Sequence, residues 1–122
     1  MKFLLDANFL MIPGKFKVDV FRELEKFGRP ELFTLDIVVK ELGKLSHGKG
    51  KSAFYAKLGL SFVQEKDIGI LESQDRKADS ELVRLSGEGF TVCTQDKILI
   101  SKIRKKGFHI IFLRQGKYLE IK

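Results

Sequence analysis

The stretch Lys2-Phe3-Leu4-Leu5-Asp6-Ala7-Asn8 opens the chain with an apolar run that meets a carboxylate at its end. A short apolar run bounded by a charge is typical of a buried strand, because helices usually need a longer periodic segment. A similar run, Phe90-Thr91-Val92-Cys93-Thr94, is followed closely by Asp96. We therefore expect two buried strands, each with an acid just beyond its carboxyl end.

Around these two runs, short apolar segments alternate with segments of helical periodicity. We expect strands at residues 2–5, 32–35, 68–71, 90–94, 109–113 and 117–121, and helices at residues 18–27, 37–45, 52–65, 76–86 and 97–106. This order predicts an α/β fold with a mostly parallel sheet covered on both faces. Ligands of such sheets bind beyond the carboxyl ends of the strands, which is where Asp6 and Asp96 fall.

The composition bounds the class of protein. A length of 122 residues, of which 43% are apolar, predicts a single domain over residues 1–122 with a core of its own. The net charge of +7 favours an anionic partner such as nucleic acid. A single cysteine, Cys93, excludes an internal disulfide and a cysteine-based zinc site.

The location is expected to be cytoplasmic, without a membrane partner. No run of 18 apolar residues is present, so the sequence predicts no transmembrane helix. Asp6 comes too early for the amino-terminal segment to be a signal peptide.

Two acids in the predicted helices fall among apolar residues on a helical wheel. Glu41 lies within the arc covered by Ile37, Val38, Leu42 and Leu45, and Asp79 lies between Leu82 and Val83. Both are therefore expected to point inward, whereas Glu81 falls on the opposite side and is expected to face solvent. A buried carboxylate without a partner costs several kcal/mol, so each inward acid needs a cation or hydrogen-bond donors.

Asp6, Glu41, Asp79 and Asp96 together make four carboxylates that could converge. Each acid alone is also compatible with a structural role, and Asp96 in particular precedes a helix and could be an ordinary N-cap. If the four meet, their oxygens suit Mg²⁺ or Mn²⁺, and crowding should raise the pKa of at least one of them. Such a centre is suited to phosphodiester hydrolysis.

The ordered set of motifs resembles the PIN-domain nucleases over essentially the whole chain. The matching motifs are Asp6-Ala7-Asn8, Val39-Lys40-Glu41-Leu42, Ala78-Asp79-Ser80-Glu81-Leu82 and Thr94-Gln95-Asp96. Within the family, the last motif looks most like archaeal relatives of the nucleases that process small-subunit ribosomal RNA. The resemblance implies a three-layer α/β/α sandwich and a divalent-metal-dependent endoribonuclease that prefers single strands.

The same resemblance implies roles for individual residues. Asp6, Glu41, Asp79 and Asp96 would be catalytic and would bind Mg²⁺ or Mn²⁺, while Asn8 and Thr94 would orient the ligands or water from behind them. Single-stranded RNA or a ribosomal RNA precursor would be the substrate. A homodimer, an antitoxin or a ribosome-assembly factor are the protein partners that the family suggests.

Two groups of basic residues stand out. Lys44, His47, Lys49 and Lys51 lie in or beside a glycine-punctuated loop soon after Glu41, and we expect Lys44, Lys49 and Lys51 to contact RNA. The second group is Lys102, Arg104, Lys105 and Lys106. We assign it to the carboxyl end of a helix, where cations complement the dipole without any ligand.

Other functions fit less of the pattern. A phosphatase of the haloacid dehalogenase type would need a second titratable acid where Asn8 stands, and a receiver domain gives Glu41 no role. A toxin ribonuclease of a toxin–antitoxin pair and a non-catalytic RNA-binding module in ribosome assembly stay open as alternatives. Cleavage of single-stranded RNA with Mn²⁺, abolished by EDTA, would separate the enzymes from the binding module.

Overall fold

A six-stranded sheet forms the middle layer of the computed structural model, which describes residues 1–122. The strand order is β3-β2-β1-β4-β5-β6; β1 to β5 are parallel, and β6 pairs antiparallel with β5. The strands are β1 (Lys2–Leu5), β2 (Glu31–Leu35), β3 (Gly69–Leu71), β4 (Phe90–Cys93), β5 (Ile110–Arg114) and β6 (Tyr118–Ile121).

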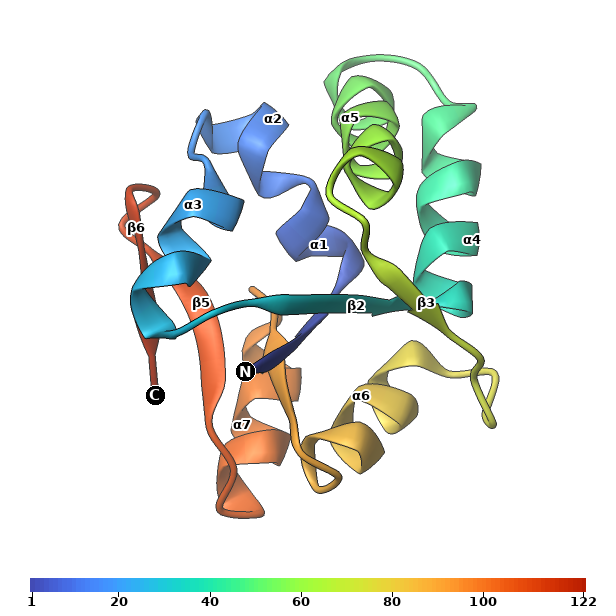
Figure 1. The fold of residues 1–122 in the computed structure, drawn as a ribbon. Helices are drawn as coiled ribbons and strands as arrows, with labels where there is room; N and C mark the ends of the chain where they lie inside the picture. Colours follow the sequence, from blue (N-terminus) through green and yellow to red (C-terminus); the bar gives the residue numbers. More distant parts are fainter.

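Helices cover both faces of this sheet (Figure 1). They are α1 (Ala7–Leu10), α2 (Ile12–Phe16), α3 (Val20–Leu24), η1 (Glu25–Phe27, a 3-10 turn), α4 (Asp36–Ser46), α5 (Lys51–Glu65), α6 (Ala78–Ser86) and α7 (Lys97–Lys105). Helices α1 to α5 lie on one side, and α6 and α7 lie on the other (Figure 1). Crossovers between parallel strands are right-handed, so the covered face changes when the chain returns past β1 to form β4. The predicted three-layer α/β/α fold is confirmed.

The core is built around β1, which lies in the interior of the sheet between β2 and β4. Phe3, Leu4 and Leu5 have no exposed surface, and Val92 and Cys93 of the neighbouring β4 are equally buried. A strand between two layers of helices must be apolar on both faces, which explains its continuous rather than alternating pattern. None of the helices is long and apolar enough to cross a membrane.

Helices α1 and α2 occupy residues for which the sequence pattern indicates no element. Each is too short to show a period, and Pro13 with Gly14 normally argues against a helix. Tertiary structure stabilises them instead: the Asp6 side chain caps α1, Pro13 stands in the first turn of α2, and Phe9 and Ile12 are buried. The predicted 18–27 helix starts later, because Asp19 caps α3 by accepting from the Arg22 N–H at 3.1 Å.

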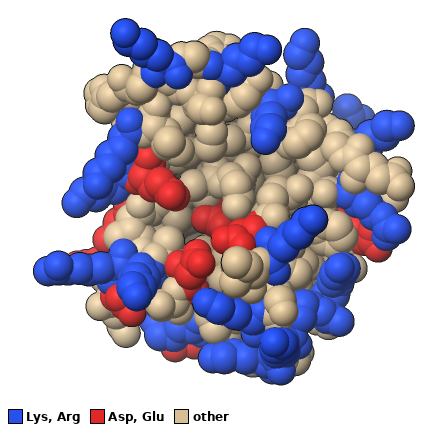
Figure 2. Space-filling model, turned by 180° about the vertical axis from the view of Figure 1, so that it is seen from behind, with Lys and Arg blue, Asp and Glu red and all other residues tan.

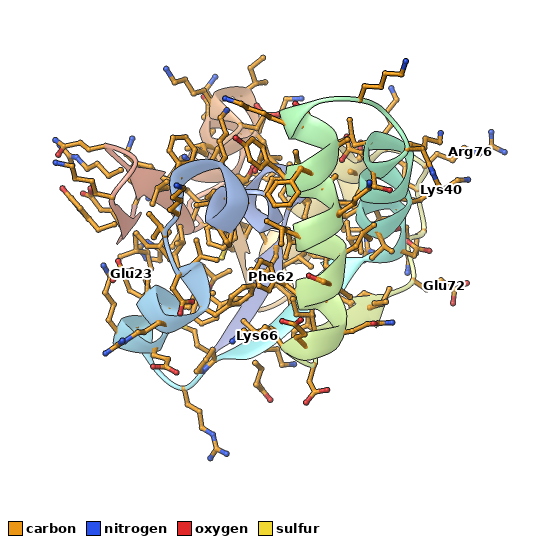
Figure 3. The ribbon with its side chains drawn as sticks, turned by 90° about the horizontal axis from the view of Figure 1, so that it is seen from above. Glu23, Lys40, Phe62, Lys66, Glu72 and Arg76 are labelled. Carbon is orange, nitrogen blue, oxygen red and sulfur yellow. The ribbon has the colours of Figure 1, made fainter.

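Helix α5 packs across the short amino-terminal helices. Its Phe62 ring lies 5.2 Å from the Phe21 ring of α3, centroid to centroid (Figure 3). Gly59 lets α5 approach α1 closely, since a Cβ built there would lie 3.2 Å from the Leu10 carbonyl oxygen and 3.4 Å from the Leu10 Cβ. The missing side chain at Gly59 therefore sets the distance between these helices.

Two helical glycines give a matched test of this packing. A Cβ at Gly43 of α4 would have no neighbour within 4 Å, so Gly43→Ala should raise the free energy of unfolding by about 0.5–1 kcal/mol through helix propensity alone. Gly59→Ala should lose that gain, and Gly59→Val should lower stability by about 1–3 kcal/mol through overpacking. Urea unfolding measures both, and an equal gain at the two positions would contradict close packing of α5 on α1.

Candidate active site

The strand order reverses beside β1, and this reversal places two loops next to each other. Strands β2 and β3 extend the sheet on one side of β1, whereas β4, β5 and β6 extend it on the other. Leu5 pairs with Cys93, and the Asp6 N–H donates to the Cys93 carbonyl at 3.1 Å. The segments after β1 and β4 therefore leave the sheet together at the position where α/β proteins bind ligands.

All four acids that the sequence singles out line one cleft at this position. The cleft has a volume of about 220 Å³, and its lining residues are Asp6, Ala7, Asn8, Met11, Glu41, Leu45, Ala78, Asp79 and Asp96. The acids come from the end of β1, from α4, from the first turn of α6 and from the N-cap of α7. Figure 2 shows one face of the molecule on which Asp and Glu side chains gather around a central hollow with Lys and Arg around them.

Asp6 lies at the bottom of the site, with 7% of its surface exposed. One carboxylate oxygen accepts from the Ala7 N–H at 2.8 Å, and the other accepts from the Thr94 hydroxyl at 2.7 Å. Burial is the main reason that the pKa of Asp6 is raised to about 6; the charges of Glu41 and Asp79 contribute less to the rise, and the hydrogen bonds from Thr94 and Ala7 oppose it. One acid of the cluster thus has a raised pKa, as expected, but burial contributes more to the rise than the crowding on which the expectation was based.

A network of polar side chains holds the two loops in register. The Asn8 side-chain oxygen accepts from the Gln95 N–H at 3.0 Å and from the Thr94 hydroxyl at 3.3 Å. The Thr94 oxygen in turn accepts from the Asp96 N–H at 3.2 Å. Asn8 and Thr94 therefore touch the acids or the turn that presents them, which is the position expected for residues that orient ligands.

Gln95 has a structural role that sequence reasoning missed. Its amide oxygen accepts from the Leu113 N–H at 2.5 Å, and its amide nitrogen donates to the Leu113 carbonyl at 3.1 Å. The side chain thus pairs with β5 as an extra strand residue would, and it fixes the β4–α7 loop to the sheet. No sequence signal could reveal this pair, since it depends on β4 and β5 being neighbours.

Asp96 is an N-cap and also lines the cleft. Its Oδ1 atom accepts from the N–H groups of Ile98 and Leu99 at 2.9 and 3.2 Å. No hydrogen bond within the protein involves its Oδ2 atom, so one oxygen remains available at the cleft. The structural and the ligand interpretations of this acid are therefore compatible.

The expectation that Glu41 and Asp79 are buried needs correction. Glu41 is exposed and Asp79 is half-buried, although both line the cleft. The apolar side of α4 faces two different environments. Val38 and Leu42 enter the core, whereas Glu41 and Leu45 line the cleft. The wheel gave the correct direction for both acids but could not distinguish a cleft from a core.

The expectation that Glu81 faces solvent is wrong. Only 1% of its surface is exposed, and its carboxylate accepts from the N–H groups of Gln74 and Asp75 at 2.6 and 2.5 Å and from Arg84 at 2.5 Å. Burial alone would raise the pKa of Glu81, but these donors, Arg84 foremost, bring it below its usual value. The loop before α6 folds over the first turn of that helix, so the side predicted to be exposed is covered.

A second carboxylate holds the same loop from α4. Asp36 accepts from the Ser73 hydroxyl, from the Ser73 N–H at 3.1 Å and from the Ile37 N–H at 2.7 Å. The exposed side chains of Glu72 and Arg76 in this loop project outward from the molecule (Figure 3). Asp36 and Glu81 together fix the segment that leads to Asp79.

The donor set of the cleft consists only of oxygen atoms, which is the preference of Mg²⁺ and Mn²⁺. In the present side-chain arrangement, no three Asp, Glu, His or Cys side chains stand close enough to enclose one ion. Two of the acids, Glu41 and Asp79, have partly or fully exposed side chains that can change rotamer. The residues thus fit a divalent cation by chemistry, and their role as ligands stays a prediction.

The lysines expected to contact RNA do not line the cleft. Lys44 is on α4, Lys49 is in the turn between α4 and α5, and Lys51 opens α5. All three are exposed, and none forms an ion pair within the protein. They are free to meet phosphates, which keeps their assignment a prediction.

Fold and cleft together define the family. The model of the PIN-like domain matches residues 3–116, and the chain belongs to this family. It is similar to the protein named Ribonuclease VapC4 from Methanocaldococcus jannaschii. The two are 28% identical over an alignment that is 127 residues long with its gaps and covers 98% of this chain and 95% of the relative.

Solved structures show the same fold. The PIN domain endonuclease Utp24 superposes with a TM-score of 0.81 and 23% identity over 99% of this chain and 90% of that one. A domain of a functionally unknown protein from Methanocaldococcus jannaschii superposes with a TM-score of 0.65 and 17% identity, covering 93% of this chain and 91% of that one. The resemblance to the PIN family that the motifs indicate is confirmed.

The raised pKa of Asp6 makes a prediction for the metal-free protein. Because the folded pKa of about 6 exceeds the ordinary value of 3.8, the contribution of Asp6 to stability should be lost as the pH rises from about 4 to about 6. Asp6→Asn removes this charge, so the variant should have a higher free energy of unfolding than the parent wherever Asp6 is ionised. The difference should be absent near pH 4 and reach up to about 3 kcal/mol above pH 7, at about 1.4 kcal/mol per pKa unit. Urea unfolding in EDTA across this range measures the difference, and a gain independent of pH would contradict a buried, titrating Asp6.

Proposed function

We propose that this protein is a divalent-metal-dependent endoribonuclease that hydrolyses phosphodiester bonds in RNA. The observation that supports it best is the cleft: in a chain of net charge +7, four acids from four separate elements line one small hollow at the strand-order reversal. Excess acids at one point of a basic protein are unfavourable unless a cation offsets them. The similarities to Ribonuclease VapC4 and to the endonuclease Utp24 agree with this function.

Asp6, Glu41, Asp79 and Asp96 are the residues that would hold Mg²⁺ or Mn²⁺. When bound, such an ion would act as a Lewis acid: it would lower the pKa of a water bound to it and offset the charge that develops on a phosphate. Asp6 is the acid that the protein orients most firmly, because Thr94 and Ala7 engage both of its oxygens. Glu41 and Asp79, being more exposed, can adjust to a substrate.

The surrounding residues would position the RNA. Lys44, Lys49 and Lys51 offer cations beside an acidic cleft, so phosphates would be held at the rim while the acids face the bond to be cleaved. Asn8 keeps the Thr94–Asp96 turn in place through its bond to the Gln95 N–H.

For the natural substrate we propose a ribosomal RNA precursor, because Thr94-Gln95-Asp96 resembles the motif of the nucleases that process small-subunit RNA. A toxin ribonuclease is the alternative with the same chemistry, and it would arrest growth when expressed without its antitoxin. A non-catalytic RNA-binding module would bind single-stranded RNA and leave it intact. Incubating such RNA with Mn²⁺, with and without EDTA, separates enzyme from module.

Asp96→Asn tests the role of the acids while keeping the fold. Asparagine can still accept from the Ile98 and Leu99 N–H groups, so α7 stays capped, but one of the crowded charges is lost. The variant should lose most RNA cleavage, and its metal-free melting temperature should stay level or rise. Mn²⁺ should stabilise the parent by about 2.7 kcal/mol at a hundredfold excess over Kd, and should stabilise the variant less.

A purely structural Asp96 would give a different pattern. The variant would then cleave RNA at the parent rate, or it would melt at a lower temperature with an unchanged response to Mn²⁺. Either result would remove Asp96 from the proposed metal centre.

The lysines beside the α4–α5 turn give a separate prediction. Lys49→Ala with Lys51→Ala should weaken binding of single-stranded RNA and reduce the slope of log K against log salt by about 0.7 for each lost phosphate contact. Stability should change by no more than about 0.5 kcal/mol, because both side chains are exposed. Fluorescence anisotropy in EDTA at several salt concentrations measures the slope, and an unchanged slope would show that these lysines only interact with solvent.

A further inference from the structure

A second, larger hollow lies next to the acidic cleft, between α7 and the β5–β6 hairpin. We call it the hairpin groove; its volume is about 720 Å³, against about 220 Å³ for the cleft. Four basic side chains line it and no acid does; the four are Lys97, Arg104, Arg114 and Lys122. Its charge is therefore the opposite of that of the cleft.

One side of the groove is a stripe along α7. Lys97, Ile100, Ser101 and Arg104 recur at intervals of three, one and three residues and so share one face of the helix. Lys97 and Arg104 are nearly two turns, or about 10 Å, apart along the helix axis. The buried residues of α7, Leu99 and Ile103, lie on another face. The residues of the stripe therefore do not take part in the packing of α7 on the sheet.

Helix electrostatics account for Arg104, which lies in the last turn of α7, but not for Lys97. Lys97 is the first residue of α7, at the end of the helix where the dipole disfavours a cation. Arg104, assigned to the carboxyl end of the helix from the sequence, points into the same groove as Lys97. A cation placed against the dipole and aligned with a second one indicates an anionic ligand rather than a stabilising surface.

The other side of the groove comes from the hairpin. Phe112 and Arg114, two residues apart on β5, project from the same face of the sheet. The Lys122 ammonium lies 5.2 Å from the centre of the Phe112 ring, and the exposed Arg114 pairs with the half-buried Glu120 at 2.7 Å. The half-buried Phe112 ring gives the groove an apolar floor beneath its cations, a combination used to stack bases and hold phosphates.

The groove begins where the cleft ends. Gln95 lines the groove, while its chain neighbour Asp96 lines the cleft, and Lys97 follows directly on the groove side. From this continuity and from the charge, we infer that the hairpin groove binds the phosphate backbone of the RNA strand as it leaves the cleft. This inference rests on the proposed function, and it assigns the substrate a direction along α7 that is separate from the lysines of the α4–α5 turn.

Paired substitutions can test the groove without touching the cleft. Arg104→Gln with Arg114→Gln removes two groove cations, and Arg22→Gln with Lys57→Gln removes two exposed cations on α3 and α5 as a matched control. Binding of labelled single-stranded RNAs of about four and about sixteen nucleotides is measured in EDTA, where no cleavage occurs. Arg104→Lys with Arg114→Lys keeps the charge and serves as the rescue variant.

The groove variant should bind the long RNA more weakly and reduce its salt slope by about 1.4, or about 0.7 for each of two lost phosphate contacts. The short RNA should bind to the groove variant as tightly as to the parent. The control variant should keep most of the salt slope of the parent, and the lysine variant should recover that slope. Amide NMR signals of Ser101 and Gln115 should move with the long RNA only. Matching melting temperatures check that all variants fold.

Other outcomes would overturn the inference. Equal losses in the groove and control variants would show only an effect of net charge, and a parent that binds poly-glutamate but no RNA would indicate an acidic protein segment as ligand. If the parent cleaves RNA with Mn²⁺ while the groove variant binds long RNA normally, the groove assignment fails and the proposed function stands. If the parent neither binds nor cleaves RNA, the proposed function itself fails.

Discussion

The hydrogen bond from the Thr94 hydroxyl to the Asp6 carboxylate joins two strand ends that lie 88 residues apart in the chain. It is possible only because β1 and β4 are parallel neighbours, with Leu5 opposite Cys93. A slip of one residue in this pairing would turn the side chains of β1 to the opposite faces of the sheet and separate the two loops. The cleft, the N-cap of α7 and the start of the hairpin groove all depend on this register.

The acids in and around the site are of two kinds, which differ in whether their neighbours are hydrogen-bond donors or other acids. Asp36 and Glu81 are surrounded by N–H, hydroxyl or guanidinium donors, and both have a pKa below the ordinary value. Asp6 has two donors, but it is buried and faces Glu41 and Asp79, and its pKa is raised, chiefly by burial. The first kind fixes the loop before α6, whereas the second leaves an electrostatic cost that a bound cation would offset. Structural acids therefore surround and support the candidate site.

Much of the fold could be predicted because the central strands β1 and β4 are short, continuous apolar segments of the chain. The strand runs ending near Asp6 and Asp96 each show this pattern, and strand–helix alternation leaves few topologies. Helices α1 and α2 could not be predicted, since segments of four and five residues have no measurable period and depend on capping and burial. Glu81 was misplaced because a helical wheel contains no information about a loop that folds over the helix.

Residue type and local periodicity are properties of neighbouring positions, so the amino-acid sequence was enough to predict the fold class and to single out four candidate acids in order. The exposure of each acid, the pairing of Gln95 with Leu113 and the groove lined by cations from α7 and from the hairpin became visible only in the folded chain. These facts concern residues distant in the chain. Burial, pKa and electrostatic potential depend on everything within a few ångströms, and folding alone chooses those neighbours.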